Sequence, residues 1–413
     1  MRVLYFHQHF STRAGAGGIR SYEFSQRLLD RGHEVTMVCG TNMRAKPKSN
    51  QVKSGEVLDY CVDGISVVEK VLPYSNHDGL FRRAVTFIRY AYFGVKLALT
   101  RDYDLLLATS TPLTAGIPGI FASIFRRKPF VFEVRDLWPE LPREMGVIRN
   151  PILLFMLDAL ESISYRTSTA CIALSPGIAE GIRKKSPAKH SIAVIPNASD
   201  LGLFNKSGDR SQIFPQLPRE SLICVFTGAH GLANGLDAAI DAANVLKNRH
   251  EANIYLVFVG DGREKPRLEQ RAKDLNLKNC LFMDLMPKER LAELLAVSDV
   301  GMQLLANIPA FYYGTSPNKF FDYLASGLPI VNNYPGWLAN LIEEHGCGHA
   351  IPPEDPEAFA DSLVAMRDDP AGREVMGRNA RRLAEESFSR DELGIKFCEF
   401  LEQHAGDRRP VQT

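Results

Sequence analysis

The sequence lacks three features that would place the protein outside a reducing compartment or within a membrane. Its seven cysteines are scattered and form no CxxC pair, which argues against a disulfide framework or a zinc site and predicts a cytoplasmic location. The opening MRVLYFHQHF contains no small-residue cleavage site, so we expect no signal peptide. The most apolar stretch, residues 105–125, is interrupted by Thr, Pro and Gly. We interpret it as a buried strand and a buried helix rather than a membrane span.

A large net charge of either sign is missing as well. Lys and Arg number 49 and Asp and Glu number 48, for a formal net charge of +1. No overall field therefore attracts nucleic acid, and we expect none as a partner. With 413 residues, the chain is too long for one core of ordinary size, and two domains are expected.

The sequence does contain a repeated alternation of apolar strands and amphipathic helices. Residues 2–10 read as a strand, 19–32 as a helix and 33–40 as a second strand, which is a βαβ unit. The polar stretch 205–220 interrupts the alternation, which then restarts. Two such series predict two doubly wound, Rossmann-like α/β domains. We place them at 1–205 and 206–385, followed by a helical tail, 386–413, that is expected to pack back on the N-terminal domain.

A glycine-rich stretch, AGAGGIR, follows the first strand. Ligands of open α/β sheets bind beyond the carboxyl ends of strands, where helix N-termini point. Gly17 and Gly18 would let the backbone approach a phosphate there. No acidic residue follows the second strand, which ends at Cys39 and Gly40, so a tight turn is an equal alternative.

A second candidate stretch is FVGDGREKPRL, in which a strand ends near Gly260 and a helix begins soon after. Arg263 and Lys265 lie where the phosphate or the base of a ligand would bind. The alternative is that both are solvated surface charges.

A third stretch, SPNKFFDYLASGLPIVNN, reads as a helix followed by a strand. Ser316 suits the N-cap, Pro317 the first turn, and Gly327 the end of the helix. Lys319 then lies in the first turn, where the helix dipole disfavours a cation, which suggests an anion nearby. Asp322, one turn further, is placed to accept the hydroxyls of a ribose. The alternative is a Lys319–Asp322 surface pair worth at most about 1 kcal/mol.

These stretches, with IALSPGIAEGI and VIPNASDLGLF, follow one another in an order and spacing that resemble family 4 retaining glycosyltransferases of the GT-B fold. The resemblance spans nearly the whole chain. The resemblance is strongest to the bacterial sugar transferases that build O-antigen, capsule and exopolysaccharide repeat units. Those proteins carry a stretch similar to EVRDLWPE, which is present here at residues 133–140. The ordered set is specific, whereas no single stretch is.

The resemblance implies an α/β, GT-B fold with two Rossmann-like doubly wound domains facing across a cleft. The N-terminal domain would bind the acceptor, and the C-terminal domain a nucleotide-diphosphate sugar, expected to be a UDP-sugar. Transfer would retain the anomeric configuration and need neither metal nor cofactor. The family's two glutamates, separated by seven residues, fall on Gly314 and Asp322, and its diphosphate lysine falls on Asn234. All three positions depart from the family, and the nearest replacement cations are Arg263, Lys265 and Lys319.

The expected site residues follow from the resemblance and the three stretches together. Asp136 would position the acceptor hydroxyl or accept its proton, and Arg135 would contact a phosphate or carboxylate. A local salt-bridge network that includes Glu133 is the alternative for this pair. The expected donor-binding residues are Gly17, Gly18, Gly228, His230, Arg263, Lys265, Ser316, Asn318, Lys319 and Asp322.

Four other titratable residues are weaker candidates. His7 and His9 share one face of the first strand, and a structural role is preferred for both. Asp102 and Asp104 form an Asp-x-Asp pattern, but they precede a strand at its amino end, away from the expected cleft. No metal site is predicted there.

Two other functions stay open. A GT-B nucleotide-sugar 2-epimerase would form its product without an acceptor. The loss of the expected carboxylate at Gly314 and of the expected lysine at Asn234 would fit a catalytically inactive partner subunit that only binds nucleotide.

The acceptor implied by the family is a saccharide linked to a polyprenyl diphosphate at the inner face of the cytoplasmic membrane. Residues 80–101 combine basic and aromatic side chains and contain no acidic residue, which predicts peripheral contact with an anionic membrane. Arg126, Arg127 and Lys128 lie in the same domain. The alternative is an ordinary core helix whose basic residues are solvated.

Overall fold

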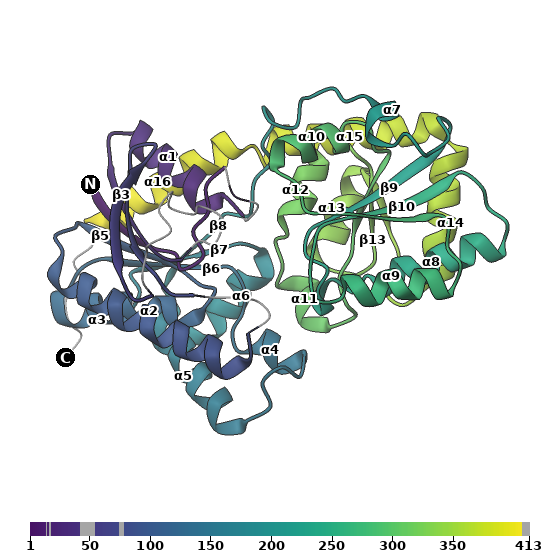
Figure 1. The fold of residues 1–413 in the computed structure, drawn as a ribbon. Helices are drawn as coiled ribbons and strands as arrows, with labels where there is room; N and C mark the ends of the chain where they lie inside the picture. The colour runs from purple at the N-terminus through teal and green to yellow at the C-terminus, as the bar shows by residue number, and fades with distance from the viewer. Residues whose placement is uncertain (14, 16–17, 42–53, 74–77, 407–413) are drawn as a thin grey trace. The chain divides into compact units, whose positions relative to one another are not determined.

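The described residues form two central β-sheets, one in each half of the chain (Figure 1). The first has eight strands in the order β3-β4-β2-β1-β5-β6-β7-β8, and the second has six in the order β11-β10-β9-β12-β13-β14. Neighbouring strands pair in parallel except β3, which is antiparallel to β4. Parallel sheets are covered by helices on both faces, which explains strands as uniformly apolar as LLLAT and IYLVFV. The predicted fold class, two doubly wound α/β domains, is confirmed.

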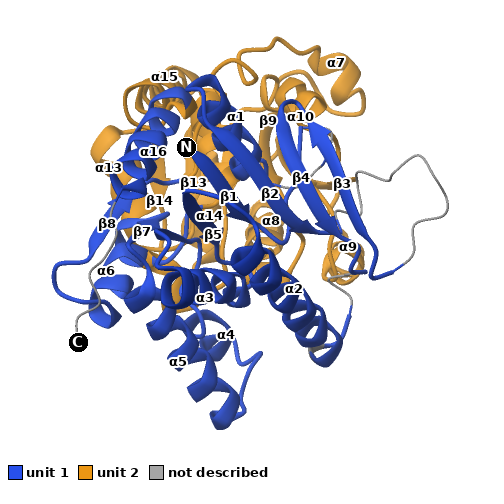
Figure 2. Ribbon diagram, turned by 90° about the vertical axis from the view of Figure 1, so that its left-hand side faces the viewer, with its two compact units in different colours: residues 1–196, 314–316, 391–413 blue, residues 197–313, 317–390 orange. Residues whose placement is uncertain are grey.

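The structure is a computed structural model that describes residues 1–13, 15, 18–41, 54–73 and 78–406. Its contacts divide the chain into two units, coloured separately in Figure 2. Unit 1 ends its main segment at Pro196, before the expected boundary at residue 205. Unit 1 comprises Met1–Pro196, Gly314–Ser316 and Asp391–Thr413, and unit 2 comprises Asn197–Tyr313 and Pro317–Arg390.

Unit 1 contains the first sheet and the helices that cover it. No helix in the described ranges is both long and apolar enough to span a bilayer. The elements are β1 (Arg2–Phe6), α1 (Arg20–Asp30), β2 (Glu34–Gly40), β3 (Val57–Val62), β4 (Ile65–Lys70), α2 (Leu80–Thr100), β5 (Leu105–Thr109), η1 (Leu113–Gly116), α3 (Ile117–Arg126), β6 (Phe130–Val134), α4 (Glu140–Glu144), α5 (Pro151–Thr167), β7 (Ala170–Ala173), α6 (Pro176–Lys185), β8 (Ser191–Val194) and the C-terminal helix α16 (Arg390–Ala405).

The C-terminal helix α16 packs within unit 1, far from its neighbours in sequence. The ring of Phe397 lies 4.6 Å from that of Phe24 on α1. Glu402 binds the guanidinium of Arg31 at the end of the same helix, at 2.8 Å. The chain therefore returns to the first sheet after it has completed the second, and α16 covers α1.

Unit 2 contains the second sheet. Its elements are α7 (Arg210–Ile213), β9 (Leu222–Thr227), η2 (Leu232–Asn234), α8 (Asp237–Asn248), β10 (Ile254–Val259), α9 (Lys265–Asp274), β11 (Cys280–Met283), α10 (Lys288–Leu295), β12 (Val300–Gln303), α11 (Pro309–Tyr313), α12 (Asn318–Ala325), β13 (Ile330–Asn332), α13 (Trp337–His345), β14 (Gly348–Ala350), α14 (Pro356–Asp368) and α15 (Pro370–Ser387).

Two local predictions from the sequence were wrong, and one strand was missed. Pro317 is extended, with ψ of 131°, and lies outside α12, so the helix begins two residues after Ser316, which is not its N-cap. The edge strand β3 is not predicted, because most of its side chains are exposed and show no alternation. The helix expected to be buried after β5, α3, has Phe125 68% exposed.

Candidate active site

The carboxyl edge of the first sheet gathers polar side chains from three strands. His7 follows β1, Ser110 and Thr111 follow β5, and Arg135 and Asp136 follow β6. Because loops after parallel strands meet at one edge, residues far apart in sequence come together there. This edge contains both residues expected to be catalytic.

Arg135 is held by a short chain of hydrogen bonds. Its guanidinium lies 3.2 Å from Nε2 of His7, whose Nδ1 lies 2.7 Å from the Ser21 hydroxyl. Burial, and then the charge of Arg135, hold the pKa of His7 well below its usual range. The ring is therefore neutral, accepts from Arg135 at Nε2 and donates from Nδ1 to Ser21. His7, expected to be structural, orients the cation that follows β6.

Asp136 has a neighbour in an unusual conformation. The hydroxyl of Thr111 donates to the Asp136 carboxylate at 3.2 Å. Thr111 has φ of +88°, which is rare for a β-branched residue and clusters at functional sites. Burial raises the pKa of Asp136, while Arg135 and Thr111 partly counter this effect. The carboxyl group is thus fixed in place and takes up a proton more readily than a solvated aspartate.

Glu133 has a structural role. Its side chain is fully buried, and one oxygen accepts from Nε of Arg20 at 3.0 Å while the other accepts from the Thr109 hydroxyl at 2.8 Å. Arg20 also donates to the carbonyl groups of Ile195 and Pro196. Glu133 thus forms its salt bridge with Arg20 rather than with Arg135 or Asp136, which stand outside that pair.

In unit 2, Lys319 in the first turn of α12 faces the loop after β9. Its Nζ donates to Oδ1 of Asn234 at 2.7 Å and lies 3.9 Å from the centre of the Phe226 ring. Burial lowers the pKa of Lys319 to about 7. Gly228, in the loop that Lys319 faces, has φ of +133°, a backbone conformation that favours glycine. A cation is thus held at a helix start without a carboxylate partner in the described part of the chain.

Asn234 stands at one of the three positions that depart from the family pattern. Its Nδ2 donates to the carbonyl of Ala229 at 2.8 Å, which leaves Oδ1 to accept from Lys319. The position where relatives would carry a lysine therefore anchors a lysine that comes from another element.

Asp322 has its own cationic partner. Its carboxylate binds Nζ of Lys288, on α10, at 2.5 Å, and the residue is 4% exposed. Lys288 also lies over the ring of Phe204, 5.3 Å from its centre. Lys319 and Asp322 are therefore held by different elements, and the alternative of a Lys319–Asp322 surface pair was wrong. One carboxylate oxygen is occupied by Lys288, and the sequence pattern gives no sign of this contact.

His230, also expected at the donor, is fully buried. Neither ring nitrogen has a hydrogen-bond partner among the described residues, and the ring is surrounded by those of Phe226, Phe258 and Phe282. Burial, more than the nearby Lys265, lowers the pKa of His230 to about 4. The ring is neutral and its polar atoms are unsatisfied, which is costly unless a ligand or water reaches them.

Lys265 and Arg263 differ in their surroundings. Lys265 donates to the carbonyl groups of Gly260 and Met283, each at 3.2 Å, and to Asp284 at 2.7 Å. It therefore ties together the ends of β10 and β11. Arg263 is exposed. Of the three replacement cations named from the sequence, Lys319 is the one that lies at a helix start between an aromatic ring and a side-chain amide.

The remaining expected site residues are less informative. Asn318 is the first residue of α12 and is exposed, and Ser316 groups with unit 1. Gly18 is exposed just before α1, whereas Gly17 lies outside the described residues. Asp102 and Asp104 precede β5, at the opposite edge of the first sheet, and both bind the guanidinium of Arg2.

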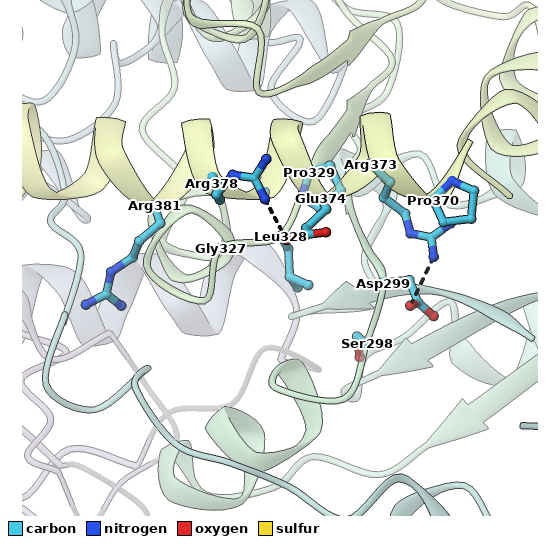
Figure 3. Close-up of a pocket in the computed structure, with 11 residues that line it drawn as sticks. Ser298, Asp299, Gly327, Leu328, Pro329, Pro370, Arg373, Glu374, Arg378 and Arg381 are labelled. Atoms are coloured by element: carbon cyan, nitrogen blue, oxygen red, sulfur yellow. Dashed lines mark hydrogen bonds and ion pairs between the residues drawn. The ribbon is translucent and has the colours of Figure 1, made fainter. Parts of the chain in front are cut away.

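Lys319 lines neither of two pockets of unit 2. One, of about 480 Å³, is at the amino ends of β12 and β13, where Arg373 and Arg378 are drawn with Asp299 and Glu374 as partners (Figure 3). The other, of about 440 Å³, lies beside the loops after β12 and β14 and is lined by acidic groups: Asp237, Asp241, Glu354 and Asp355. Paired arginines and an acidic wall are both poor hosts for a diphosphate.

Comparison with known proteins identifies the class of protein to which this chain belongs. A family model described as "Glycosyl transferase 4-like domain" matches residues 15–198, and one described as "Glycosyl transferases group 1" matches residues 209–383. The molecule is a glycosyltransferase of the GT-B fold. The chain belongs to the family that joins these two domains, as the resemblance in its sequence implied.

Individual similar proteins are more distant. "Probable glycosyltransferase WbjE" of Pseudomonas aeruginosa is 25% identical over 299 residues, 70% of this chain and 72% of that protein. The structure of Anabaena HepE in complex with UDP-glucose has a TM-score of 0.70 at 17% identity and covers 98% of this chain and 100% of that one. WaaG, a glycosyltransferase involved in lipopolysaccharide biosynthesis, has a TM-score of 0.68 at 16% identity with 98% and 100% coverage. These two structures support the fold.

Proposed function

We propose that the protein is a retaining glycosyltransferase that moves a sugar from a UDP-sugar to a lipid-linked saccharide in surface polysaccharide biosynthesis, without metal or cofactor. The observation that carries this proposal is Lys319, a cation at the start of α12 that lacks a carboxylate partner in the described residues and has a pKa lowered to about 7. Such a group is favourable only when an anion joins it. HepE, solved with UDP-glucose, supports a UDP-sugar as that anion.

The donor would lie along the carboxyl edge of the second sheet. Lys319 and the backbone N–H groups of α12 would face the diphosphate, where negative charge develops as the sugar leaves. The Asp322 oxygen that Lys288 does not occupy would accept a ribose hydroxyl. His230 would supply one of its unsatisfied ring nitrogens to the same ligand.

The acceptor would bind unit 1 at the carboxyl edge of the first sheet. Asp136 positions the acceptor hydroxyl, and Arg135 holds a phosphate of its carrier. The bond from the sugar C1 to the diphosphate oxygen breaks, and a bond from C1 to the acceptor oxygen forms on the same face. The hydroxyl proton passes to the departing diphosphate. WaaG, involved in lipopolysaccharide biosynthesis, supports an acceptor of the surface polysaccharide class.

One assay tests this function. Purified protein is incubated in excess EDTA with a panel of UDP- and GDP-sugars and a polyprenyl-diphosphate-linked saccharide, and the product is analysed by NMR. We expect transfer from a UDP-sugar, with the anomeric configuration of the donor. An inverted product, or an absolute requirement for Mn²⁺ or Mg²⁺, would contradict the proposed mechanism.

The missing carboxylate at Gly314 also favours a second candidate, a catalytically inactive nucleotide-binding subunit. A single-turnover measurement separates the two, because only the enzyme consumes a stoichiometric amount of donor when acceptor is present. Conversion of the donor without any acceptor would instead indicate a nucleotide-sugar 2-epimerase.

A further inference from the structure

Unit 2 contains a cavity of about 440 Å³ that the proposed function leaves unused. It is lined by the starts of α8 and α14 and by residues that follow β12, β13 and β14. These two helices pack side by side (Figure 1). Residues that follow parallel strands stand at the carboxyl edge of the sheet, where doubly wound domains bind small molecules. We call this space the α8–α14 cavity.

The walls of the cavity are held in place by hydrogen bonds. The Asn333 side chain accepts from the backbone N–H of Leu305 at 3.0 Å and donates to the carbonyl of the same residue at 3.1 Å. The backbone N–H of Ala306 donates to the carbonyl of Ala233 at 3.0 Å, which joins the loops after β12 and β9. The cavity therefore exists before any ligand binds, and little ordering would be needed on binding.

The floor of the cavity is apolar. It is formed by Leu305, Ile351 and Phe359, which are all buried, and we call these three residues the apolar floor. Pro352 and Pro356 line the cavity beside them. Alkyl groups gain free energy when they leave water for such a surface, so the ligand should carry an apolar body.

The polar part of the lining is acidic, and none of the residues that line the cavity is a lysine or an arginine. On the α8 side, Asp237 and Asp241 are partly neutralised from α9. Asp237 binds the guanidinium groups of Arg267 and Arg271, each at 2.5 Å, and Asp241 binds Arg271 at 2.6 Å through one oxygen. The other carboxylate oxygen of Asp241 has no donor among the described residues.

On the α14 side, the negative charge is not neutralised. Glu354 and Asp355 stand directly before α14, and neither forms an ion pair with a cation in the described part of the chain. One Asp355 oxygen accepts from the backbone N–H of Ala358 at 2.8 Å and so caps the helix. Glu354 is exposed and has φ of +57°, a conformation that favours glycine or asparagine. A carboxylate is therefore kept at a position that a turn alone would fill more easily with another residue.

These surroundings select the charge of the ligand. A phosphate or a nucleotide would meet four carboxylates and no cation from the lining. A bare metal ion is also a poor occupant, because no group of three or more acidic, His or Cys side chains in the described ranges converges on a metal position. A neutral sugar could donate to the carboxylates but would not balance their charge. A linear chain of methylene groups that carries ammonium groups at intervals suits both the apolar floor and the acidic walls.

We propose that the α8–α14 cavity binds a linear polyamine, with one ammonium group at Glu354 and Asp355 and its methylene groups over the apolar floor. A second ammonium group donates to the Asp241 oxygen that Arg271 leaves unoccupied. Hydrogen bonds from an ammonium group to a carboxylate are strong, because both partners are charged. This inference goes beyond the proposed function and does not depend on it, since the cavity shares no lining residue with the proposed donor site.

The test is a calorimetric titration of the full-length protein with spermidine at low ionic strength. Glu354→Gln with Asp355→Asn removes the charge that is not neutralised and keeps the helix cap, because asparagine also caps. The matched control, Glu357→Gln with Asp361→Asn, removes two carboxylates of α14 that bind Arg249 and do not line the cavity. We expect the first variant to bind spermidine about tenfold more weakly than wild type and the control to bind it like wild type.

A third variant tests the shape of the site. Ala238 lies in the first turn of α8 and lines the cavity, so Ala238→Phe should fill it and abolish spermidine binding while every charge stays. No binding by wild type, unchanged binding by Ala238→Phe or an equal loss in the matched control would overturn the proposal. So would displacement of spermidine by a neutral diol of similar length, or by Mg²⁺ at equal ionic strength.

The titration also separates this inference from the proposed function. It needs neither donor nor acceptor, so a failure of spermidine binding and a failure of glycosyl transfer are distinct results. If no donor or acceptor supports transfer but the cavity variants still change spermidine binding as expected, the proposed function fails and the polyamine site stands.

Discussion

Both sheets are doubly wound, but the charged side chains at their carboxyl edges have different surroundings. In unit 1, Glu133 and Arg20 are buried together, and every oxygen of the carboxylate has a donor. In unit 2, Lys319 is enclosed beside Phe226 and Asn234, and the described residues offer it no carboxylate. The first arrangement pairs both charges within the chain, whereas the second leaves a cation without a carboxylate partner among the described residues.

The two carboxyl edges also differ in whether backbone or side chains occupy the space there. At the second edge, Gly260 and Gly262 let the loops after β9 and β10 touch, and a Cβ at Gly262 would lie 2.4 Å from the carbonyl oxygen of His230. At the first edge, side chains of His7, Thr111 and Arg135 fill the corresponding region. Glycine allows the backbone of a loop to come close to a phosphate. Side chains held in fixed positions suit the recognition of a hydroxyl.

The largest effect should come from breaking the buried ion pair of Glu133 and Arg20 in unit 1. Glu133→Ala leaves Arg20 buried without its anion, and we expect the free energy of unfolding to fall by about 3–5 kcal/mol. Urea unfolding of the variant measures this. Asp102→Ala serves as a control, because its carboxylate is exposed with Arg2 and should change the unfolding curve little. A Glu133 variant as stable as wild type would contradict the structural role of the pair.

Removal of the Lys319 cation in unit 2 should lower activity rather than stability. Lys319→Ala should lower kcat/KM by about 100- to 1,000-fold, because the charge it faces grows in the transition state. The melting temperature should stay the same or rise, since an enclosed ammonium is lost. Arg263→Ala, which changes an exposed residue, should have a small effect on both. If the Arg263 variant loses more activity than the Lys319 variant, the diphosphate lies elsewhere.

Asp322 tests whether a paired carboxylate at the second edge also serves a ligand. Asp322→Ala should raise the Kd for UDP by about tenfold or more, since a charged hydrogen bond contributes about 1.5–3 kcal/mol, and Asp322→Asn should raise it less. Lys288→Met breaks the same ion pair but keeps the carboxylate. Calorimetric titration should therefore show UDP affinity near that of wild type for Lys288→Met. Equal losses in the Lys288 and Asp322 variants would mean that Asp322 acts only through its ion pair.

The sequence predicted the fold because it depends on local patterns. Apolar runs between helical segments indicated parallel sheets, the end of a strand placed Arg135 and Asp136 at a carboxyl edge, and the helix pattern placed Lys319 in a first turn. Contacts between distant elements were beyond such patterns: Lys288 with Asp322, Arg20 with Glu133, and His7 with Arg135 join residues 34 or more positions apart. The start of α12 was missed because a proline suits both the first turn and the residue before it.

The smallest effect concerns the pH dependence of donor binding at the second edge. Because burial lowers the pKa of Lys319 to about 7, the free protein loses this charge as pH rises through that value. The diphosphate of a UDP-sugar does not titrate there, so UDP-sugar affinity should fall about fivefold from pH 7 to pH 8.

The same ionisation should affect stability with the opposite trend. An unfolded lysine stays protonated up to its usual pKa of 10.5, so the native state binds fewer protons between about pH 7 and that value. The free energy of unfolding should therefore rise with pH across this window, and the gain should be lost as pH falls through the folded pKa. Lys319→Arg, which stays charged, should flatten both the affinity profile and the stability profile. A wild-type affinity that is constant from pH 6.5 to 8.5, measured by calorimetry at constant ionic strength, would mean that Lys319 is already charged in the free protein, and the edge would then hold a permanent cation rather than one completed by the donor.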